Sequence, residues 1–139
     1  MTHPSWFRST KTYRNLPCAH RRWQHEGHCA HVHGYSRSFT FTFRCTERTK
    51  NGFVMDFGDL KPVKAWLEQH FDHTLLLDAD DPLLPQFQEL ENQGACKLVV
   101  YADVGMEGSA KFVFDWLAPW IAKHTQGRVS LESVECREN

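Results

Sequence analysis

Apolar residues in the first half of the chain alternate with polar ones. Phe39, Phe41 and Phe43 are separated by single polar residues within the run from His31 to Cys45. A period of two places successive side chains on opposite faces of a strand, so this run predicts a half-buried β-strand. The segment from Trp6 to His20 carries apolar residues among polar ones, and it predicts another strand.

Two later segments have the spacing of helices. After Asp59, which we expect to cap a helix, apolar residues recur every third or fourth position as far as Phe71. A second helix is predicted from Glu107 to His124, because its apolar residues form one stripe. Gly127 is a typical residue just past the end of a helix, where the backbone becomes left-handed.

The connection between the two predicted helices is long and irregular. We expect a loop from Leu75 to Asn92, with a short helix over residues 86–92. Residues 97–102 form a short β-prone run, and residues 128–137 alternate imperfectly and predict a last strand. The order strand, strand, helix, connection, helix, strand indicates an α+β domain with antiparallel strands and both helices on one face.

Length and composition narrow the class of protein. A chain of 139 residues is expected to form one domain, residues 1–139. A net charge of -1 does not indicate a nucleic-acid partner. No apolar run approaches the roughly 20 residues of a membrane span, and residues 1–6 lack the apolar core of a signal peptide, so we expect a cytoplasmic protein. The five cysteines are scattered without a CxxC pair, which argues against a disulfide framework.

Histidine is the unusual residue of this sequence. Five histidines fall within fourteen residues: His20, His25, His28, His31 and His33. Side chains two apart on a strand share a face, so His31 and His33 could hold one metal ion, with His20 as a third ligand from a neighbouring strand. Three protein ligands with an open position are the pattern of catalytic zinc. The alternative is a set of surface histidines on a polar loop, and the residues alone leave both open.

Other residues could carry chemistry, and each also has a plain structural reading. Cys29 beside a metal could act as a base or nucleophile, or it could be a half-buried cysteine of no consequence. Asp72 could orient the imidazole of His73, or His73 could simply be favoured by the dipole at the end of a helix. Glu107 suits the start of a helix, and Glu138 is by default a solvated charge.

Several short motifs resemble the 6-pyruvoyl-tetrahydropterin synthase / 6-carboxy-tetrahydropterin synthase family over nearly the whole chain. In chain order they are Cys18-Ala19-His20, Cys29, His33-Gly34-Tyr35, Gly52 to Phe57, Phe71-Asp72-His73 with Leu75, and Glu138-Asn139. Each motif is weak alone, but their order and spacing make the resemblance specific.

The chain departs from the family pattern at three places. Tyr35 stands where the family has the second histidine of His-Gly-His, and Glu107 is all that remains of a Pro-Thr-x-Glu motif. The connection from Leu76 to Asp103 is longer than the family pattern predicts. The sequence also stops at Asn139, where the family's last strand pairing continues, which leaves open that it is a piece of a longer chain.

The resemblance implies a fold, an assembly and a ligand set. The fold would be the tunnelling fold (T-fold), an antiparallel four-stranded sheet with two helices on one face. Subunits of this fold form an oligomeric barrel, here expected as a homohexamer with active sites at subunit interfaces. The resemblance also implies a zinc ion, for which we favour His20, His31 and His33 as ligands.

The resemblance also implies a role for each candidate residue. Cys29 would move a side-chain proton of dihydroneopterin triphosphate, with Asp72 and His73 as the partner acid/base pair. The carboxylate of Glu138 would bind the amino-pyrimidinone edge of the pterin, since two adjacent N–H donors suit a bidentate carboxylate. Two further substrate contacts are expected, at Glu107 and at Tyr35.

The leading hypothesis is therefore a lyase that forms 6-carboxy-tetrahydropterin, on the route to queuosine and related deazapurines. A 6-pyruvoyl-tetrahydropterin synthase acting on the same substrate is the enzymatic alternative. A pterin-binding paralogue without turnover is a different class. Tyr35 and the missing Pro-Thr favour it, and the presence of Cys29, Asp72, His73 and Glu138 argues against it. An unrelated metal-binding α+β protein is the remaining hypothesis.

Overall fold

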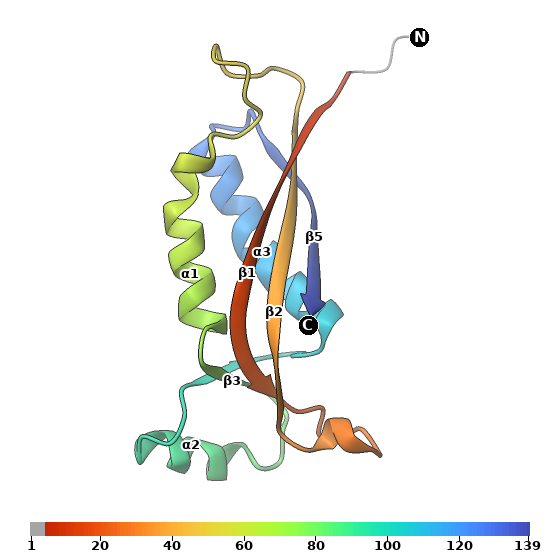
Figure 1. Ribbon diagram of the computed structural model, residues 1–139, viewed down its shortest axis with the longest axis vertical. Helices are drawn as coiled ribbons and strands as arrows, with labels where there is room; N and C mark the ends of the chain where they lie inside the picture. Colours follow the sequence, from red (N-terminus) through yellow and green to blue (C-terminus); the bar gives the residue numbers. More distant parts are fainter. Residues whose placement is uncertain (1–4) are drawn as a thin grey trace.

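The computed structural model describes residues 5–139. Its strands are β1 (Phe7–His20), β2 (His33–Cys45), β3 (Thr74–Asp78), β4 (Leu98–Tyr101) and β5 (Ser130–Glu138). Its α-helices are α1 (Lys61–Phe71), α2 (Leu84–Asn92) and α3 (Met106–His124), and the short 3₁₀ helices are η1 (His28–Ala30) and η2 (Phe57–Leu60). The long strands β1, β2 and β5 lie side by side, with α1 and α3 on one side of them (Figure 1). The α+β prediction is confirmed.

The sheet is mixed and has the strand order β4-β3-β1-β2-β5. Strand β2 is antiparallel to both β1 and β5, as predicted. Strand β3 runs parallel to the end of β1, and β4 runs parallel to β3. The prediction of a four-stranded antiparallel sheet with two helices is therefore wrong. Among residues 5–139 the sheet has five strands of mixed direction, and there are three α-helices.

The missed strand β3 accounts for this error. All five residues of β3 are buried, including Leu75, Leu76 and Leu77 in succession. A strand that is buried on both faces shows no alternation, so its period could not separate it from the loop predicted there. The short helix and the β-prone run predicted downstream are confirmed as α2 and β4. Residues 74–101, here named the inserted segment, lie beside the end of β1 in the lower part of Figure 1.

The core lies between the three long strands and the two long helices. Phe39, Phe41 and Phe43 of β2 are completely buried, as are Leu67 of α1 and Leu117 of α3. Each such side chain contributes about 1.5–3 kcal/mol when it leaves water. The alternation that predicted β2 thus reflects one face packed against helices. This packing holds the three long strands in fixed register, and it also fixes where their ends meet.

Individual capping residues determine where the long helices begin and end. Asp59 does not cap α1, so that prediction is wrong. Instead, Asp56 caps η2, the short helix that leads into α1. Its side chain accepts a hydrogen bond of 2.9 Å from the Gly58 amide. The predicted end of α3 is confirmed at Gly127, whose φ is 82°. Among the described residues, no helix is long and apolar enough to span a bilayer.

Candidate active site at one end of the sheet

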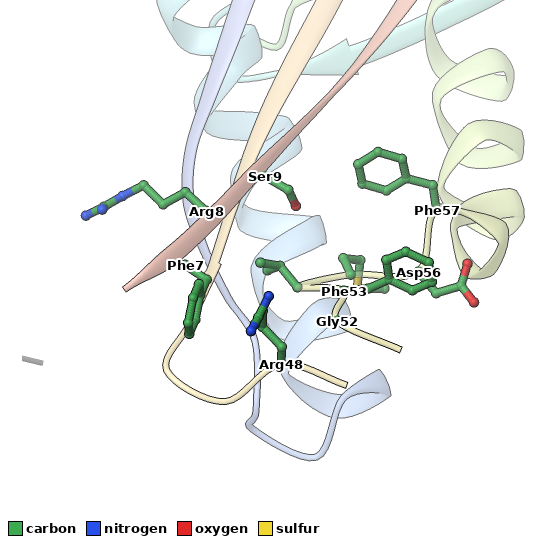
Figure 2. Close-up of a pocket in the computed structure, with 10 residues that line it drawn as sticks. Phe7, Arg8, Ser9, Arg48, Gly52, Phe53, Asp56 and Phe57 are labelled. Atoms are coloured by element: carbon green, nitrogen blue, oxygen red, sulfur yellow. The ribbon is translucent and has the colours of Figure 1, made fainter. Parts of the chain in front are cut away.

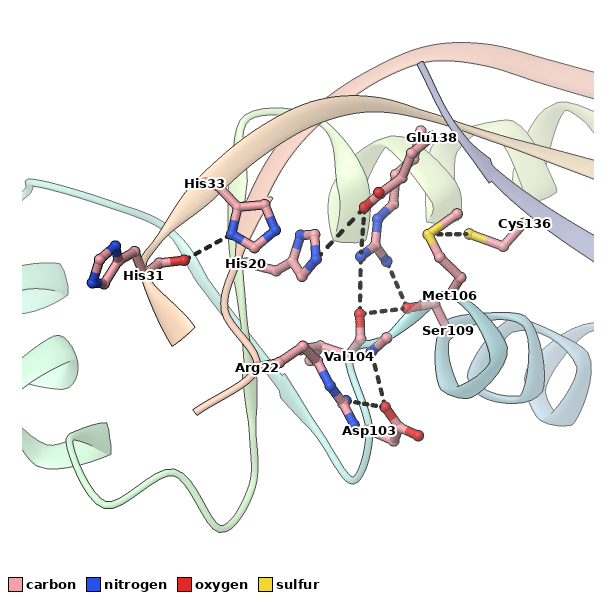
Figure 3. Close-up of polar contacts among 12 residues, drawn as sticks. His20, Arg22, His31, His33, Asp103, Val104, Met106, Ser109, Cys136 and Glu138 are labelled. Atoms are coloured by element: carbon pink, nitrogen blue, oxygen red, sulfur yellow. Dashed lines mark hydrogen bonds and ion pairs between the residues drawn. The ribbon is translucent and has the colours of Figure 1, made fainter. Parts of the chain in front are cut away.

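Three strand ends meet at the same end of the sheet. Strand β1 ends at His20, β2 begins at His33, and β5, antiparallel to β2, ends at Glu138. His20 and His33 are direct partners in the β1–β2 ladder, and their ring centres are 4.4 Å apart. Figure 3 shows the ring of His20 between His33 and Glu138. Strand register, rather than nearness in sequence, therefore assembles this group.

His20 is held as a neutral imidazole. Only 7% of its side chain is exposed, and its Nδ1 is buried without a hydrogen-bond partner among residues 5–139. Burial and then the charge of Arg37 lower the pKa of His20 to about 3. Buried polar atoms normally have partners, so a free imidazole nitrogen calls for an explanation. A neutral imidazole is the form that binds metals, and the donor set here therefore fits a zinc ion.

His33 has the orientation of a supported metal ligand. Its Nδ1 lies 2.7 Å from the main-chain carbonyl of His31, which accepts a hydrogen bond from the ring N–H. The proton on Nδ1 leaves Nε2 with its lone pair. Metal-ligating histidines usually donate their second ring N–H in this way.

His31 is placed differently from the sequence expectation. It precedes β2, which begins at His33, and its side chain is exposed. In Figure 3 its ring points away from His20 and His33, and only its carbonyl faces the site. Within residues 5–139 no three His, Cys, Asp or Glu side chains converge as a ready metal site. The role of His31 as third ligand stays a prediction.

Tyr35 lies next to the histidine pair. Its ring meets the ring of His33 edge-on, with centres 5.5 Å apart. The residue is 47% exposed, so its hydroxyphenyl group can meet a molecule that enters from solvent. Tyr35 and His33 stand two residues apart on β2 and therefore share a face of the sheet.

The carboxylate of Glu138 faces two nitrogen-bearing side chains. One of its oxygens lies 3.5 Å from Nε2 of His20 and 3.6 Å from a guanidinium nitrogen of Arg37. The Glu138 side chain is 27% exposed, so the carboxylate is supported from inside and still reachable from solvent. This is the arrangement that a binding carboxylate requires.

Arg37 is a central residue that the sequence reasoning missed. It is completely buried, and it donates hydrogen bonds of 2.6 Å to the Ser109 hydroxyl and 2.9 Å to the Val104 carbonyl. Ser109 in turn lies 2.7 Å from the Tyr101 hydroxyl. Arg37 therefore ties the first turns of α3 to the site. A signal existed in the sequence: Arg37 occupies the same face of β2 as the buried Phe39.

Asp72 and His73 form the predicted pair. Their side chains are 2.7 Å apart, between Oδ1 of Asp72 and Nδ1 of His73. His73 has a positive φ of 58°, and its amide donates a hydrogen bond of 2.7 Å to the Pro17 carbonyl. The His73 side chain is 85% exposed. The backbone turn after α1 thus presents the imidazole to solvent while the carboxylate fixes its tautomer.

The remaining predicted residues lie at different distances from this centre. Tyr35 and His73 line the same open hollow of about 450 Å³, whose floor includes Cys18. Cys29 lies half-buried in η1 and makes no hydrogen bond to Asp72 or His73 within residues 5–139.

Glu107 does not join the group formed by the histidines and Glu138. It lies exposed in the first turn of α3 and lines a separate hollow of about 360 Å³, together with Asp103 and Phe112. Its role as a substrate contact therefore stays a prediction.

A larger hollow lies at the other end of the long strands. It has a volume of about 510 Å³ and is lined by Phe7, Phe53, Phe57 and Arg48, whose guanidinium lies 4.4 Å from the ring centre of Phe7 (Figure 2). No histidine or cysteine lines it. Chemistry rather than volume therefore places the candidate active site at the end that holds His20.

Comparisons with known proteins identify the family of the chain. The family model described as 6-pyruvoyl tetrahydropterin synthase matches residues 10–139. The 6-carboxy-5,6,7,8-tetrahydropterin synthase of Rickettsia conorii is 34% identical over 74 residues, which are 52% of each chain. The chain thus spans about half the length of this curated relative.

Solved structures share the fold at lower identity. An uncharacterised protein from Wolinella succinogenes has a TM-score of 0.82 at 22% identity, covering 97% of this chain and 94% of that one. A Plasmodium vivax 6-pyruvoyltetrahydropterin synthase has a TM-score of 0.61 at 16% identity, covering 96% and 99%. Because the family model spans nearly the whole chain and the strand ends place the motif residues together, this chain belongs to the 6-pyruvoyl tetrahydropterin synthase family.

Proposed function

We propose that the protein is a zinc-dependent lyase that converts dihydroneopterin triphosphate to 6-carboxy-tetrahydropterin, on the route to queuosine and related deazapurines. The observation that carries the proposal is the group formed by His20, His33 and Glu138, where a neutral imidazole pair adjoins a partly open carboxylate. The names of the curated relatives support the 6-carboxy product.

The carboxylate of Glu138 is the proposed pterin anchor. Two parallel N–H donors on the amino-pyrimidinone edge would each find one carboxylate oxygen, and such charge-assisted pairs are short and strong. Arg37 faces this carboxylate from the buried side, 3.6 Å away, and can orient it. Tyr35, at the mouth of the same site, is the proposed contact for the rest of the substrate.

The proposed zinc ligands are His20 and His33, with His31 or Tyr35 completing the set. The unpaired Nδ1 of His20 and the carbonyl-supported ring of His33 are the features that fit a metal ion. When bound, zinc would hold the side-chain hydroxyls of the substrate. Recruitment of His31 requires its exposed ring to turn toward the pair, whereas Tyr35 already adjoins His33.

Proton transfer is assigned to Cys29 and to the pair formed by Asp72 and His73. Asp72 accepts a hydrogen bond from the Nδ1–H of His73, so Nε2 of His73 is free to take or give a proton. Cys29 would move the proton on the substrate side chain from the opposite side. These two groups make no hydrogen bond with each other within one chain, which suits a site that neighbouring subunits complete.

Open strand edges support an oligomer. Strand β5 is an outer strand of the sheet, and β1 pairs with β3 only from Cys18 to His20, which leaves the longer part of β1 unpaired on that side. Exposed edges of this kind pair readily with other strands. We propose a closed homohexameric barrel, in which β1 of one subunit pairs with β5 of the next. Light scattering at micromolar concentration tests this, and a monomer would contradict it.

Product analysis tests the reaction. The protein is incubated with dihydroneopterin triphosphate, and the pterin product is identified by mass spectrometry. We expect 6-carboxy-tetrahydropterin. A 6-pyruvoyl product would support the alternative that the names of the solved relatives suggest. Binding of the pterin without turnover would identify a paralogue that has lost its activity, as the tyrosine at position 35 would suggest.

Metal analysis tests the ligands separately. We expect about one zinc per subunit, since a catalytic site of three ligands holds a single ion. His33→Ala should remove it. If His31→Ala retains the full zinc content, the third ligand is Tyr35 or water.

A further inference from the structure

The inserted segment packs against the loop that carries Cys29. This loop, residues 21–32, joins β1 to β2 and is here named the Cys29 loop. The inserted segment overlaps the connection from Leu76 to Asp103, which is predicted from the sequence to be longer than in the family pattern. Three successive residues of the loop, Arg21, Arg22 and Trp23, each reach a carboxylate near the end of β3.

The strongest of these contacts joins Arg21 to Asp81. The guanidinium donates two parallel hydrogen bonds, from Nε and Nη2, each 2.6 Å long, to the two carboxylate oxygens. The Asp81 carboxylate is completely buried, and only 13% of the Arg21 side chain is exposed. The Arg21 hydrogen bonds hold the pKa of Asp81 below its usual range. Such a bidentate buried pair is geometrically specific, unlike a surface ion pair.

Asp81 is itself fixed within the inserted segment. Its Oδ1 accepts a hydrogen bond of 2.9 Å from the Leu83 amide at the start of α2, and its own amide donates one of 3.0 Å to the Asp78 carbonyl. The ring centre of Phe87 in α2 lies 5.9 Å from the Arg21 guanidinium. Arg21 is therefore anchored to a folded unit rather than to a mobile side chain.

The free end of the Arg21 guanidinium reaches the backbone beside Cys29. Its Nη1 donates a hydrogen bond of 3.3 Å to the Ala30 carbonyl. The amide of the next residue, Arg22, donates one of 2.6 Å to the carbonyl of Cys29 itself. Two consecutive carbonyls, those of Cys29 and Ala30, are thus held by Arg21, which is bound to Asp81, and by its chain neighbour Arg22.

We propose that Arg21 is a positioning residue for Cys29 and that the inserted segment, through Asp81, is its anchor. The inference rests on the proposed role of Cys29 in proton transfer. A thiol that must meet one carbon-bound proton needs a fixed backbone, and a displacement of about 1 Å can reduce turnover roughly a hundredfold. The inserted segment then has a function: it holds in place the twelve-residue Cys29 loop, whose regular structure is limited to the three-residue helix η1.

Two variants test the proposal. Asp81→Asn removes the charge of the anchor but retains an oxygen that can accept the Leu83 hydrogen bond. Arg21→Lys keeps the positive charge but loses the planar fork that contacts Asp81 and Ala30 together. Glu89→Gln is the matched control, because Glu89 lies exposed on α2 of the same inserted segment and bonds only Gln93.

We measure kcat, KM, zinc content and residue-resolved hydrogen exchange for all three. Both test variants should lower kcat by about ten- to a hundredfold with KM unchanged, because the proposed substrate anchor Glu138 is untouched. The amides of Arg22 and His31 should exchange faster, while those of β2 keep their rates. Glu89→Gln should match the parent protein in every measurement.

The outcomes separate this proposal from the proposed function. Unchanged exchange at Arg22 and His31, or faster exchange with unchanged kcat, overturns the positioning role. A rise in KM with unchanged kcat also overturns it, because the inserted segment would then serve substrate binding. If the parent protein turns over no pterin, the proposed function fails, while the exchange measurement still decides whether Asp81 holds the loop.

Discussion

The two halves of the candidate site differ in how completely one chain builds them. The half around Glu138 is enclosed: Arg37 is completely buried and hydrogen-bonded to Ser109 and Val104, and it lies 3.6 Å from the carboxylate. The half that would move protons is open, since the His73 side chain is 85% exposed and Cys29 lies in a loop. Under the proposed function, recognition would be preorganised within one chain, whereas proton transfer would depend on parts that meet across the loop or between subunits.

The largest expected effect is a loss of turnover when Cys29, in the open half, is replaced. Cys29→Ala should lower kcat by about a hundred- to ten-thousandfold, the usual range for the loss of a general acid or base. Because the enclosed half is unaffected, KM, zinc content and oligomeric state should not change. Steady-state kinetics measures kcat and KM, and metal analysis measures the zinc content. Parent-level turnover by this variant would show that another group moves the proton.

The next largest effect is a fall in kcat/KM when Glu138, in the enclosed half, is replaced. Glu138→Gln keeps the shape of the side chain but replaces one acceptor oxygen with an amide donor. Hydrogen bonds to charged groups contribute about 1.5–3 kcal/mol, so kcat/KM should fall by roughly ten- to a hundredfold, mainly through KM.

Glu135→Gln is the matched control for this variant. Glu135 lies exposed on the same strand, and its carboxylate is 4.0 Å from Arg137, which is also exposed. It should behave as the parent protein. Equal losses in both variants would show that charge on β5, rather than a specific contact of Glu138, governs binding.

The same comparison explains which parts the sequence could predict. The phenylalanines of β2 and the apolar stripes of α1 and α3 have clear periods, so those elements were predicted correctly. Leu75 to Leu77 have no period because both faces of β3 are buried, and the strand was missed. Short motifs led to His20, His33, Asp72 and His73, but the contact between His20 and Glu138 depends on the pairing of three strands. The position of Arg37 on the buried face of β2 could be inferred from the sequence, but its contacts with Ser109, Val104 and Glu138 could not, because these residues lie far away in the chain.

A smaller effect is expected from Arg37→Met, which fills the same volume without charge. Val104 loses a hydrogen-bond donor, but Ser109 keeps its contact with Tyr101, and Glu138 can turn to solvent. Unfolding free energy should therefore fall by about 1 kcal/mol, near the lower limit for unsatisfied buried groups. KM should rise with kcat retained, because the carboxylate is no longer held. Urea denaturation and kinetics measure the two effects.

Arg44→Met provides the control for Arg37→Met. Arg44 is on the same strand and lies 3.6 Å from Glu132, but its side chain is 36% exposed. A surface ion pair of this kind contributes little, so stability should change by less than about 0.5 kcal/mol. Equal destabilisation by the two variants would contradict the distinction between the enclosed half and the surface of the sheet.

The smallest expected effect is that of Cys18→Ala, which separates the reactive cysteine from the buried ones. Burial chiefly raises the pKa of Cys18 to about 11 and that of Cys136 to about 12, and Cys45 is completely buried. At pH 7 a thiol with such a pKa is thiolate in only about one molecule in ten thousand. Cys18→Ala should therefore retain parent-level turnover, and iodoacetamide at neutral pH should label Cys29 first, as peptide mass mapping would show. Reaction of Cys18 before Cys29 would show that the buried thiol at the end of β1 is more reactive than the thiol in the Cys29 loop, which contradicts the assignment of Cys29 as the reactive cysteine of the open half.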